Sequence, residues 1–181
     1  MIDKIRSNDL RSEQLTENNF QEVKNFNSFE RELVDFLLKD ALKNQEMHIS
    51  TTHLWFYKPS NELAGYITLL TDRISLLPAQ KEIFKKKGVN YKSLPALKIG
   101  RLCVHDKFLR KGIGTHMVDA LILLIQDLNK KAGCRFIVLD AKRNQDKSKD
   151  AVHFYKTLGF EVYKSREKGT ISMYKDVYQL I

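Results

Sequence analysis

Apolar residues follow a helical spacing in some parts of the chain and a strand spacing in others, which predicts a mixed α/β fold. A helical period runs over residues 28–43, and Asn27 stands where an N-cap residue is expected. Two β-rich runs follow at 52–58 and 63–70, and the turn-forming residues 59–62 between them predict an antiparallel hairpin. The apolar face of the helix is expected to pack on this sheet.

The second half alternates between the same two patterns, with glycines at several helix ends. The expected elements are, in chain order, a short helix from Pro78 to Gly88, a strand over 97–104, a helix over 112–131, a buried strand over 135–140, a helix over about 149–158 that Gly159 ends, and a hairpin of strands 160–164 and 170–175.

Composition narrows the class of protein. The chain has 181 residues, 43% of them hydrophobic, and no Pro-, Gly- or Ser-rich linker divides it, so we expect one domain over 1–181. No apolar run reaches the roughly 18 residues that a membrane-spanning helix needs, and residues 1–10 lack the hydrophobic stretch of a signal peptide. We therefore expect a cytoplasmic protein with no membrane contact.

The two cysteines, Cys103 and Cys134, lack the spacing of metal ligands. They are therefore predicted to be buried thiols, with no metal site.

Charge is distributed unevenly along the chain. Residues 1–80 hold 9 basic and 12 acidic side chains, whereas residues 81–181 hold 22 and 10, which gives the second half a net charge of +12. This charge favours an anionic partner, and a polyphosphate cofactor, an RNA or an acidic protein would each satisfy it. Solvated lysines without a partner are the alternative.

Residues 109–115, LRKGIGT, have a form that suits anion binding. Two glycines, Gly112 and Gly114, lie between a strand and a helix, where the first amides of the helix point at one place and can bind a phosphate. The segment lacks the Gly-Lys-Ser/Thr of a nucleotide P-loop and the third glycine of a dinucleotide-binding fold, which excludes both. By itself the pattern is also typical of an ordinary helix start.

A second motif makes the pattern specific. Residues 151–160, AVHFYKTLGF, lie on the helix after the next strand. Together the two segments resemble the GNAT superfamily of acetyl-CoA-dependent N-acetyltransferases, whose phosphate loop has the form Q/R-x-x-G-x-G/A and whose later helix ends in A-x-x-F-Y-x-x-x-G-F. The resemblance covers residues 97–175. It implies a twisted, mixed and mostly antiparallel sheet of about six to seven strands, flanked by about four helices and splayed where acetyl-CoA binds.

The resemblance also implies which residues hold acetyl-CoA. Backbone N–H groups of residues 109–115 would bind the pyrophosphate, although Leu109 stands where the family has Gln or Arg. The end of the preceding strand would pair with the pantetheine arm, and Asn144 or Ser148 would bond to that arm, since Ser148 replaces the usual Asn of the family. The expected cofactor-binding residues are Leu102, Cys103, Val104, Leu109, Arg110, Lys111, Gly112, Ile113, Gly114, Thr115, Asn144, Ser148, Ala151 and Phe154.

Two groups are implied in catalysis. Tyr155 stands where many members of the family place the general acid, and a phenol of pKa roughly 10 can protonate a departing thiolate of pKa about 8.5. A backbone N–H near Val104 would polarise the thioester carbonyl. Strand 97–104 has no carboxylate to act as general base, and His105 is the nearest titratable side chain. This gap favours an acceptor amine of low pKa, such as an α-amine.

Three functions stay open at this stage. The segments FLLKDALKNQ, THLWFY, AGYITLL and LPALKIGRLCV are similar to the branch of the family with bacterial toxins that acetylate the α-amine of aminoacyl-tRNA. In that interpretation basic side chains bind tRNA, and the candidates are Lys85, Lys86, Lys87, Arg101, Lys142 and Arg143. That interpretation is the alternative; the function that the sequence favours is acetylation of a primary amine of a small molecule, peptide or protein.

The third is a catalytically inactive acyl-CoA-binding module, which the retained glycine loop and Tyr155 argue against. Neither Cys103 nor Cys134 has a recognisable His–Asp pair beside it, so direct transfer from acetyl-CoA to the amine is expected in place of an acyl-cysteine intermediate. Homodimers are common in the family, and the sequence indicates no interface.

Overall fold

The structure is a computed structural model that describes residues 3–144, 150–165 and 169–179. It divides into two compact units. The first unit comprises Met1–Leu70 and Ile99–Leu123, and the second comprises Thr71–Lys98 and Leu124–Ile181. The expectation of one domain over the whole chain stays a prediction.

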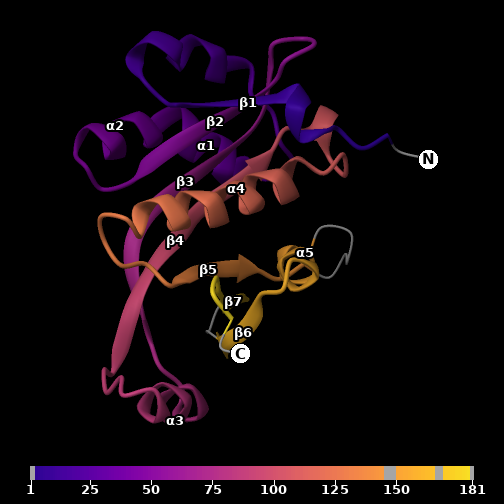
Figure 1. The fold of residues 1–181 in the computed structure, drawn as a ribbon. Helices are drawn as coiled ribbons and strands as arrows, with labels where there is room; N and C mark the ends of the chain where they lie inside the picture. Colours follow the sequence, from indigo (N-terminus) through magenta and orange to yellow (C-terminus); the bar gives the residue numbers. More distant parts are fainter. Residues whose placement is uncertain (1–2, 145–149, 166–168, 180–181) are drawn as a thin grey trace. The chain divides into compact units, whose positions relative to one another are not determined.

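Helices and strands alternate along the chain (Figure 1), which confirms the predicted mixed α/β class. In chain order the elements are η1 (Ser7–Asp9), β1 (Leu10–Gln14), η2 (Glu17–Asn25), α1 (Arg31–Lys39), α2 (Ala41–Glu46), β2 (Thr51–Tyr57), β3 (Glu62–Ser75), α3 (Pro78–Lys86), β4 (Ser93–Val104), η3 (Asp106–Phe108), α4 (Ile113–Leu128), β5 (Phe136–Lys142), α5 (Ala151–Thr157), β6 (Glu161–Ser165) and β7 (Thr170–Asp176). The labels η mark short 3-10 helices.

The strands form a seven-stranded sheet in the order β1-β2-β3-β4-β5-β7-β6. The pairs β1–β2, β2–β3, β5–β7 and β6–β7 are antiparallel. The two predicted hairpins are therefore confirmed: β2 pairs with β3 and β6 with β7. The mostly antiparallel sheet agrees with the expected fold.

The core of the first unit lies between its strands and the helices α1 and α2. Tyr66 of β3 is fully buried there, and its hydroxyl donates a hydrogen bond to the carbonyl of Leu33 at 2.7 Å. Full burial of one large apolar side chain stabilises a fold by about 1.5–3 kcal/mol. The buried members of this core are Leu15, Val23, Phe26, Val34, Leu37, Ala41, Leu54, Phe56, Leu63, Tyr66 and Cys103.

The opposite face of β3 is in contact with α4. Because successive side chains of a strand point to opposite faces, a side chain at position 65 would lie on the face opposite that of Tyr66. A Cβ at Gly65 would collide with the Met117 methyl group of α4 and would lie 2.8 Å from the carbonyl oxygen of Cys103. The absence of a side chain at Gly65 therefore allows α4 to pack closely against β3.

The second unit has its own core under α3. Phe136 of β5 contacts the rings of Phe84 on α3 and Tyr174 on β7, with ring centroids 6.3 and 6.1 Å apart. The guanidinium of Arg135 lies 5.0 Å from the centroid of the Phe84 ring and pairs with Asp176 at 2.9 Å. The helix α3 is thus held to β5 and β7 through its one buried face.

Two elements of the first unit differ from the prediction. The helix expected over 28–43 begins three residues late, because Asp106 accepts the N–H of Phe29 at 3.0 Å and holds the residues before the helix in a loop. Asn27 is therefore no N-cap, and its amide donates to Asp106 instead, at 3.3 Å. The helix also divides at Asp40, whose φ is −117°, so the described residues form five α-helices where about four were expected. Strand β1 was missed because its sequence LRSEQ has one buried apolar residue at the sheet edge.

Among the described residues, no helix has the length and apolar character that spanning a bilayer requires. Within the same ranges, His, Cys, Asp and Glu side chains form no cluster that could hold a metal ion.

Candidate functional site

The chain enters α4 through a loop with two left-handed residues. After η3, Arg110 has φ +62° and Gly112 has φ +89°, and glycine adopts that conformation without steric cost. Residue His105 caps η3, since its Nδ1 accepts the N–H of Lys107 at 3.1 Å. Phe108 anchors the loop with 2% of its surface exposed.

Ile5, in the segment before β1, forms hydrogen bonds that hold this loop in place. The N–H of Ile5 donates to the carbonyl of Lys111 at 2.9 Å, and Nε2 of His116 lies 2.9 Å from the carbonyl oxygen of Ile5. A carbonyl only accepts hydrogen bonds, so Nε2 of His116 carries a proton in this contact. Ile5 therefore contacts both the backbone of the loop, at Lys111, and a side chain in the first turn of α4, at His116.

The amides of this loop are left without acceptors. In the part of the chain that the structure describes, the N–H groups of Arg110 and of residues 112–115 donate to no oxygen, whereas the N–H of His116 bonds to the carbonyl of Gly112 at 3.1 Å. A run of free N–H groups at a helix start combines hydrogen-bond donors with the positive end of the helix dipole. The arrangement suits an anion of the size of a pyrophosphate.

In the second unit, α5 presents one tyrosine in an aromatic cluster. Asp150 caps the helix by accepting the N–H of Val152 at 3.2 Å. The ring of Tyr155 packs edge-on against Phe154 and Phe160, with centroids 5.0 and 5.3 Å apart, and 7% of the residue is exposed. Gly159, with φ +80°, ends the helix as predicted.

The hydroxyl of Tyr155 has no hydrogen-bond partner among the described residues. Burial raises the pKa of Tyr155 above its ordinary value, because a phenolate loses solvation in an apolar cluster. The phenol of Tyr155 therefore stays protonated across the physiological pH range.

Both motifs lie in a segment that matches a known family. The sequence model of the acetyltransferase (GNAT) family matches residues 17–160. The chain belongs to this family. As a GNAT protein it is an acetyltransferase, in agreement with the resemblance seen in the sequence.

Solved GNAT structures share the fold. A structure of AtaT complexed with acetyl-methionyl-tRNAfMet has a TM-score of 0.72 at 22% identity, over 91% of this chain and 94% of that one. A mutant of KacT has a TM-score of 0.74 at 19% identity, over 94% and 96% of the two chains. A mutant of the AtaT toxin, bound to the C-terminus of the antitoxin AtaR and to acetyl-CoA, has a TM-score of 0.72 at 19% identity, over 94% of each chain.

The expected GNAT residues at the end of β4 lie on both faces of the strand. Cys103 points into the core of the first unit with 4% of its surface exposed, while Leu102 and Val104 are half-buried. Burial raises the pKa of the Cys103 thiol to about 12, against a smaller opposing effect of a hydrogen bond with Ser28. At neutral pH the thiol is protonated and enclosed, so it is a poor nucleophile.

His105 is a poor candidate for the missing general base. Its Nδ1 lone pair is used in the cap of η3, so in the neutral ring the proton resides on Nε2. The sequence reasoning missed Asp106, the next residue, which joins the start of α1 to the loop. Its only signal was a carboxylate two residues after the end of β4, because the partners Asn27 and Phe29 are distant in the sequence.

The remaining predicted cofactor-binding residues differ in how far they are exposed to solvent. Leu109 and Arg110 are exposed, Lys111 is half-buried, and the buried residues Ile113 and Gly114 begin α4. In the second unit, Ala151 and Phe154 of α5 are half-buried, and the exposed Asn144 follows β5. Ser148 lies outside the described residues.

Proposed function

We propose that this GNAT protein uses acetyl-CoA to acetylate the α-amine of aminoacyl-tRNA. The observation that carries the acetyl-CoA assignment is the free N–H run of Arg110 and residues 112–115. That run is a fitting cradle for the pyrophosphate, since donors fixed by the surrounding backbone need no reorganisation on binding.

Other residues are proposed to hold the rest of the co-substrate. The backbone of Leu102, Cys103 and Val104 would pair with the pantetheine arm, with Asn144 or Ser148 as a further contact. Acetyl-CoA supplies an acetyl group activated as a thioester. The side chains Leu109 and Arg110 are exposed and need not contribute, because the backbone donors of the loop suffice for the phosphates.

The proposed transfer is direct. The neutral amine attacks the thioester carbonyl carbon, and the backbone N–H of Val104 stabilises the oxyanion that forms. Tyr155 donates its proton to the sulfur as the carbon–sulfur bond breaks, the amine nitrogen loses one proton to solvent, and the phenolate regains a proton from solvent. Because burial raises the pKa of Tyr155, the phenol keeps its proton until negative charge develops on the sulfur. The enclosed Cys103 thiol takes no part.

The acceptor is inferred from the missing base. Strand β4 carries no carboxylate, and His105 has its Nδ1 occupied. A lysine ammonium of pKa about 10.4 would need a base, whereas an α-amine near 8, and lower in an aminoacyl ester, is partly neutral by itself. The likeness to AtaT, whose complex holds acetyl-methionyl-tRNAfMet, supports the same acceptor class.

A second candidate is a small cationic amine. Glu30 and Asp106 both act to raise the pKa of the Cys103 thiol, so two carboxylates lie close to the end of β4. Negative charge at that place would attract a polyamine or an aminoglycoside-like amine. This alternative predicts an acceptor that competes with polyamines.

The test is transfer of labelled acetyl from acetyl-CoA into two pools, aminoacyl-tRNA and a panel of small amines, at low and moderate salt. The proposal predicts label on the tRNA that decreases as salt rises. As a matched control, N-formylated methionyl-tRNA offers the same RNA without a free α-amine and should take no label. Label only in the small amines would reject the tRNA assignment and support the second candidate.

A further inference from the structure

The corner between α3 and β4 concentrates unpaired positive charge in the second unit. Residues 76–92 hold five lysines and a single carboxylate, Glu82. Within the described ranges none of these lysines forms an ion pair or a side-chain hydrogen bond. The exposed lysines are Lys81, Lys85, Lys86, Lys87 and Lys92.

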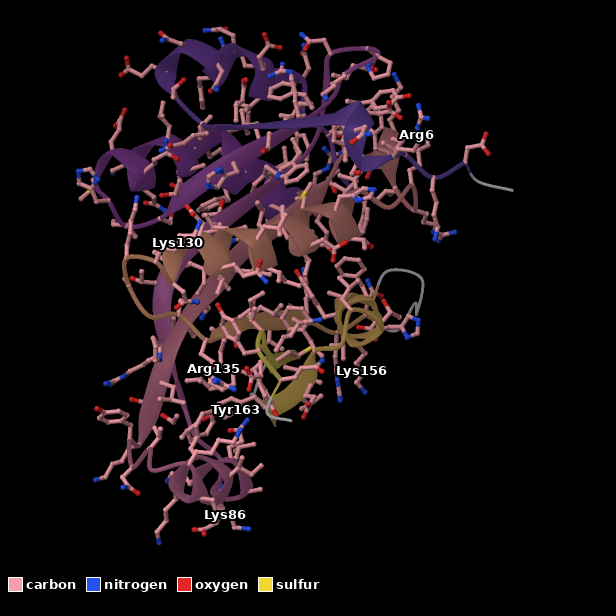
Figure 2. The ribbon with its side chains drawn as sticks, in the orientation of Figure 1. Arg6, Lys86, Lys130, Arg135, Lys156 and Tyr163 are labelled. Atoms are coloured by element: carbon pink, nitrogen blue, oxygen red, sulfur yellow. The ribbon has the colours of Figure 1, made fainter. Side chains whose placement is uncertain are left out.

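The backbone holds the C-terminal lysines in place. Gly88 has φ +78°, its N–H bonds to the carbonyl of Lys85 at 2.9 Å, and the N–H of Val89 bonds to the carbonyl of Phe84 at 2.9 Å. These two bonds form a Schellman motif that ends α3. Since Phe84 is 4% exposed in the core, the last turn of the helix is anchored while its lysines face solvent. Figure 2 shows Lys86 at the outer side of α3.

An exposed aromatic ring lies in the same segment. Tyr91 is 70% exposed and stands directly before Lys92, and its hydroxyl has no partner among the described residues. Lysines at the end of a helix also interact well with its dipole, which would account for Lys85 and Lys86 alone. The helix dipole explains neither the presence of Lys92, which lies beyond the helix, nor the exposure of the Tyr91 ring to solvent.

We propose that the α3–β4 corner binds RNA, with lysines 85–87 and Lys92 on phosphates and Tyr91 stacked on an unpaired base. Cationic side chains around an aromatic platform recognise the two features that every single-stranded or looped RNA shares, its phosphates and its base faces. This inference rests on the proposed function, because it assigns to this surface the tRNA that carries the acceptor amine.

The test measures RNA binding separately from catalysis. Binding of fluorescently labelled deacylated tRNA is followed by anisotropy across a salt series for the variant Lys85→Gln/Lys86→Gln. Loss of two phosphate contacts should weaken binding about tenfold near 0.15 M salt and lower the log–log salt slope by about 1.4 to 1.8. The matched control, Lys24→Gln/Lys43→Gln, removes the same charge from exposed positions of η2 and α2 and should bind like the wild type.

Tyr91 gives an independent measurement. Tyr91→Ala should weaken tRNA binding about fivefold or more, whereas Tyr91→Phe keeps the stacking ring and should bind within twofold of the wild type. Melting temperatures verify that the exposed substitutions leave the fold intact. Equal losses for the α3 and control double variants, or no loss for either, would overturn the proposed surface, and equal losses for Tyr91→Phe and Tyr91→Ala would overturn the stacking.

The two proposals fail in different ways. If wild-type protein labels aminoacyl-tRNA and the α3 variants bind tRNA normally, the function stands and this surface is rejected. If the α3 variants lose tRNA binding while the wild type labels only small amines, the surface stands and the acceptor assignment is rejected.

Discussion

The loop at 109–115 and the helix α5 carry the two motifs of the family. They differ in the groups that they present, which are backbone N–H groups in the loop and a side chain in the helix. The loop presents backbone N–H groups, and the side chain of Leu109 in it is exposed. Helix α5 presents one side-chain hydroxyl, that of Tyr155, set between Phe154 and Phe160. In the proposed function, the loop binds an anion that does not change, and the helix gives up a proton once in each cycle.

This contrast assigns different kinetic effects to the two regions. Interactions made equally in the ground state and the transition state change Kd, while interactions made only in the transition state change kcat. Damage to the loop should therefore appear in the affinity for acetyl-CoA. Damage to α5 should appear in turnover.

The largest expected effect is that of Tyr155→Phe. Loss of the proton donor should lower kcat about 10²-fold or more, because the thiolate then leaves unprotonated. The Kd for acetyl-CoA, measured by calorimetry, should change less than twofold. Tyr163→Phe removes a hydroxyl that bonds to the carbonyl of Ser75 at 2.8 Å, and this control should keep wild-type turnover. Normal turnover of Tyr155→Phe would remove the general-acid assignment.

Next in size is the effect of Thr115→Pro on binding. Proline is tolerated in the first turn of a helix, and here it deletes one N–H that has no protein acceptor. Loss of one charge-assisted hydrogen bond should raise the Kd for acetyl-CoA about tenfold, with kcat at saturation nearly unchanged. Thr115→Val keeps the N–H and should bind normally. Equal Kd values for the two variants would show that this amide does not hold the pyrophosphate.

A smaller effect on activity is expected for Cys103→Ala, because Cys103 belongs to neither the 109–115 loop nor α5. Because the thiol is enclosed and protonated, kcat/KM should stay within about threefold of the wild type. The cavity should lower the free energy of unfolding by about 1–2 kcal/mol, measured by urea titration. Abolished turnover with normal acetyl-CoA binding would point to an acyl-cysteine intermediate and contradict direct transfer.

The smallest expected effect is that of His53 on how the stability of the fold depends on pH, which involves neither the loop nor α5. Burial lowers the pKa of His53 below its ordinary value, so the unfolded chain takes up the proton first as pH falls. The free energy of unfolding should decrease as pH falls below roughly 6.5. His53→Gln should flatten this part of the pH profile in urea titrations. An identical profile for the variant would mean that other groups cause the loss.

The sequence predicts best where short motifs act through the backbone. Gly112 and Gly159 both adopt the left-handed backbone that glycine allows without steric cost, and this preference is local. The hairpin of β2 and β3 was equally local. The motif proposes Tyr155 as a catalytic residue, which stays a prediction, whereas its aromatic neighbours became visible only in the structure.

Features that depend on distant partners could not be predicted. Asp106 moves the start of α1 by accepting the N–H of Phe29, and the two residues are far apart in the sequence. Strand β1 owes its place to pairing with β2, since its own sequence is too polar to indicate a strand. The clamp of Ile5 on the 109–115 loop is of the same kind.

The most direct test of the central claim is the mass of the aminoacyl-adenosine released by nuclease from methionyl-tRNA after reaction with wild-type protein and acetyl-CoA. The account predicts a gain of one acetyl group on the α-amine, with none when Tyr155→Phe replaces the wild type over the same time. Unmodified methionyl-adenosine, under conditions in which small amines are acetylated, would contradict it.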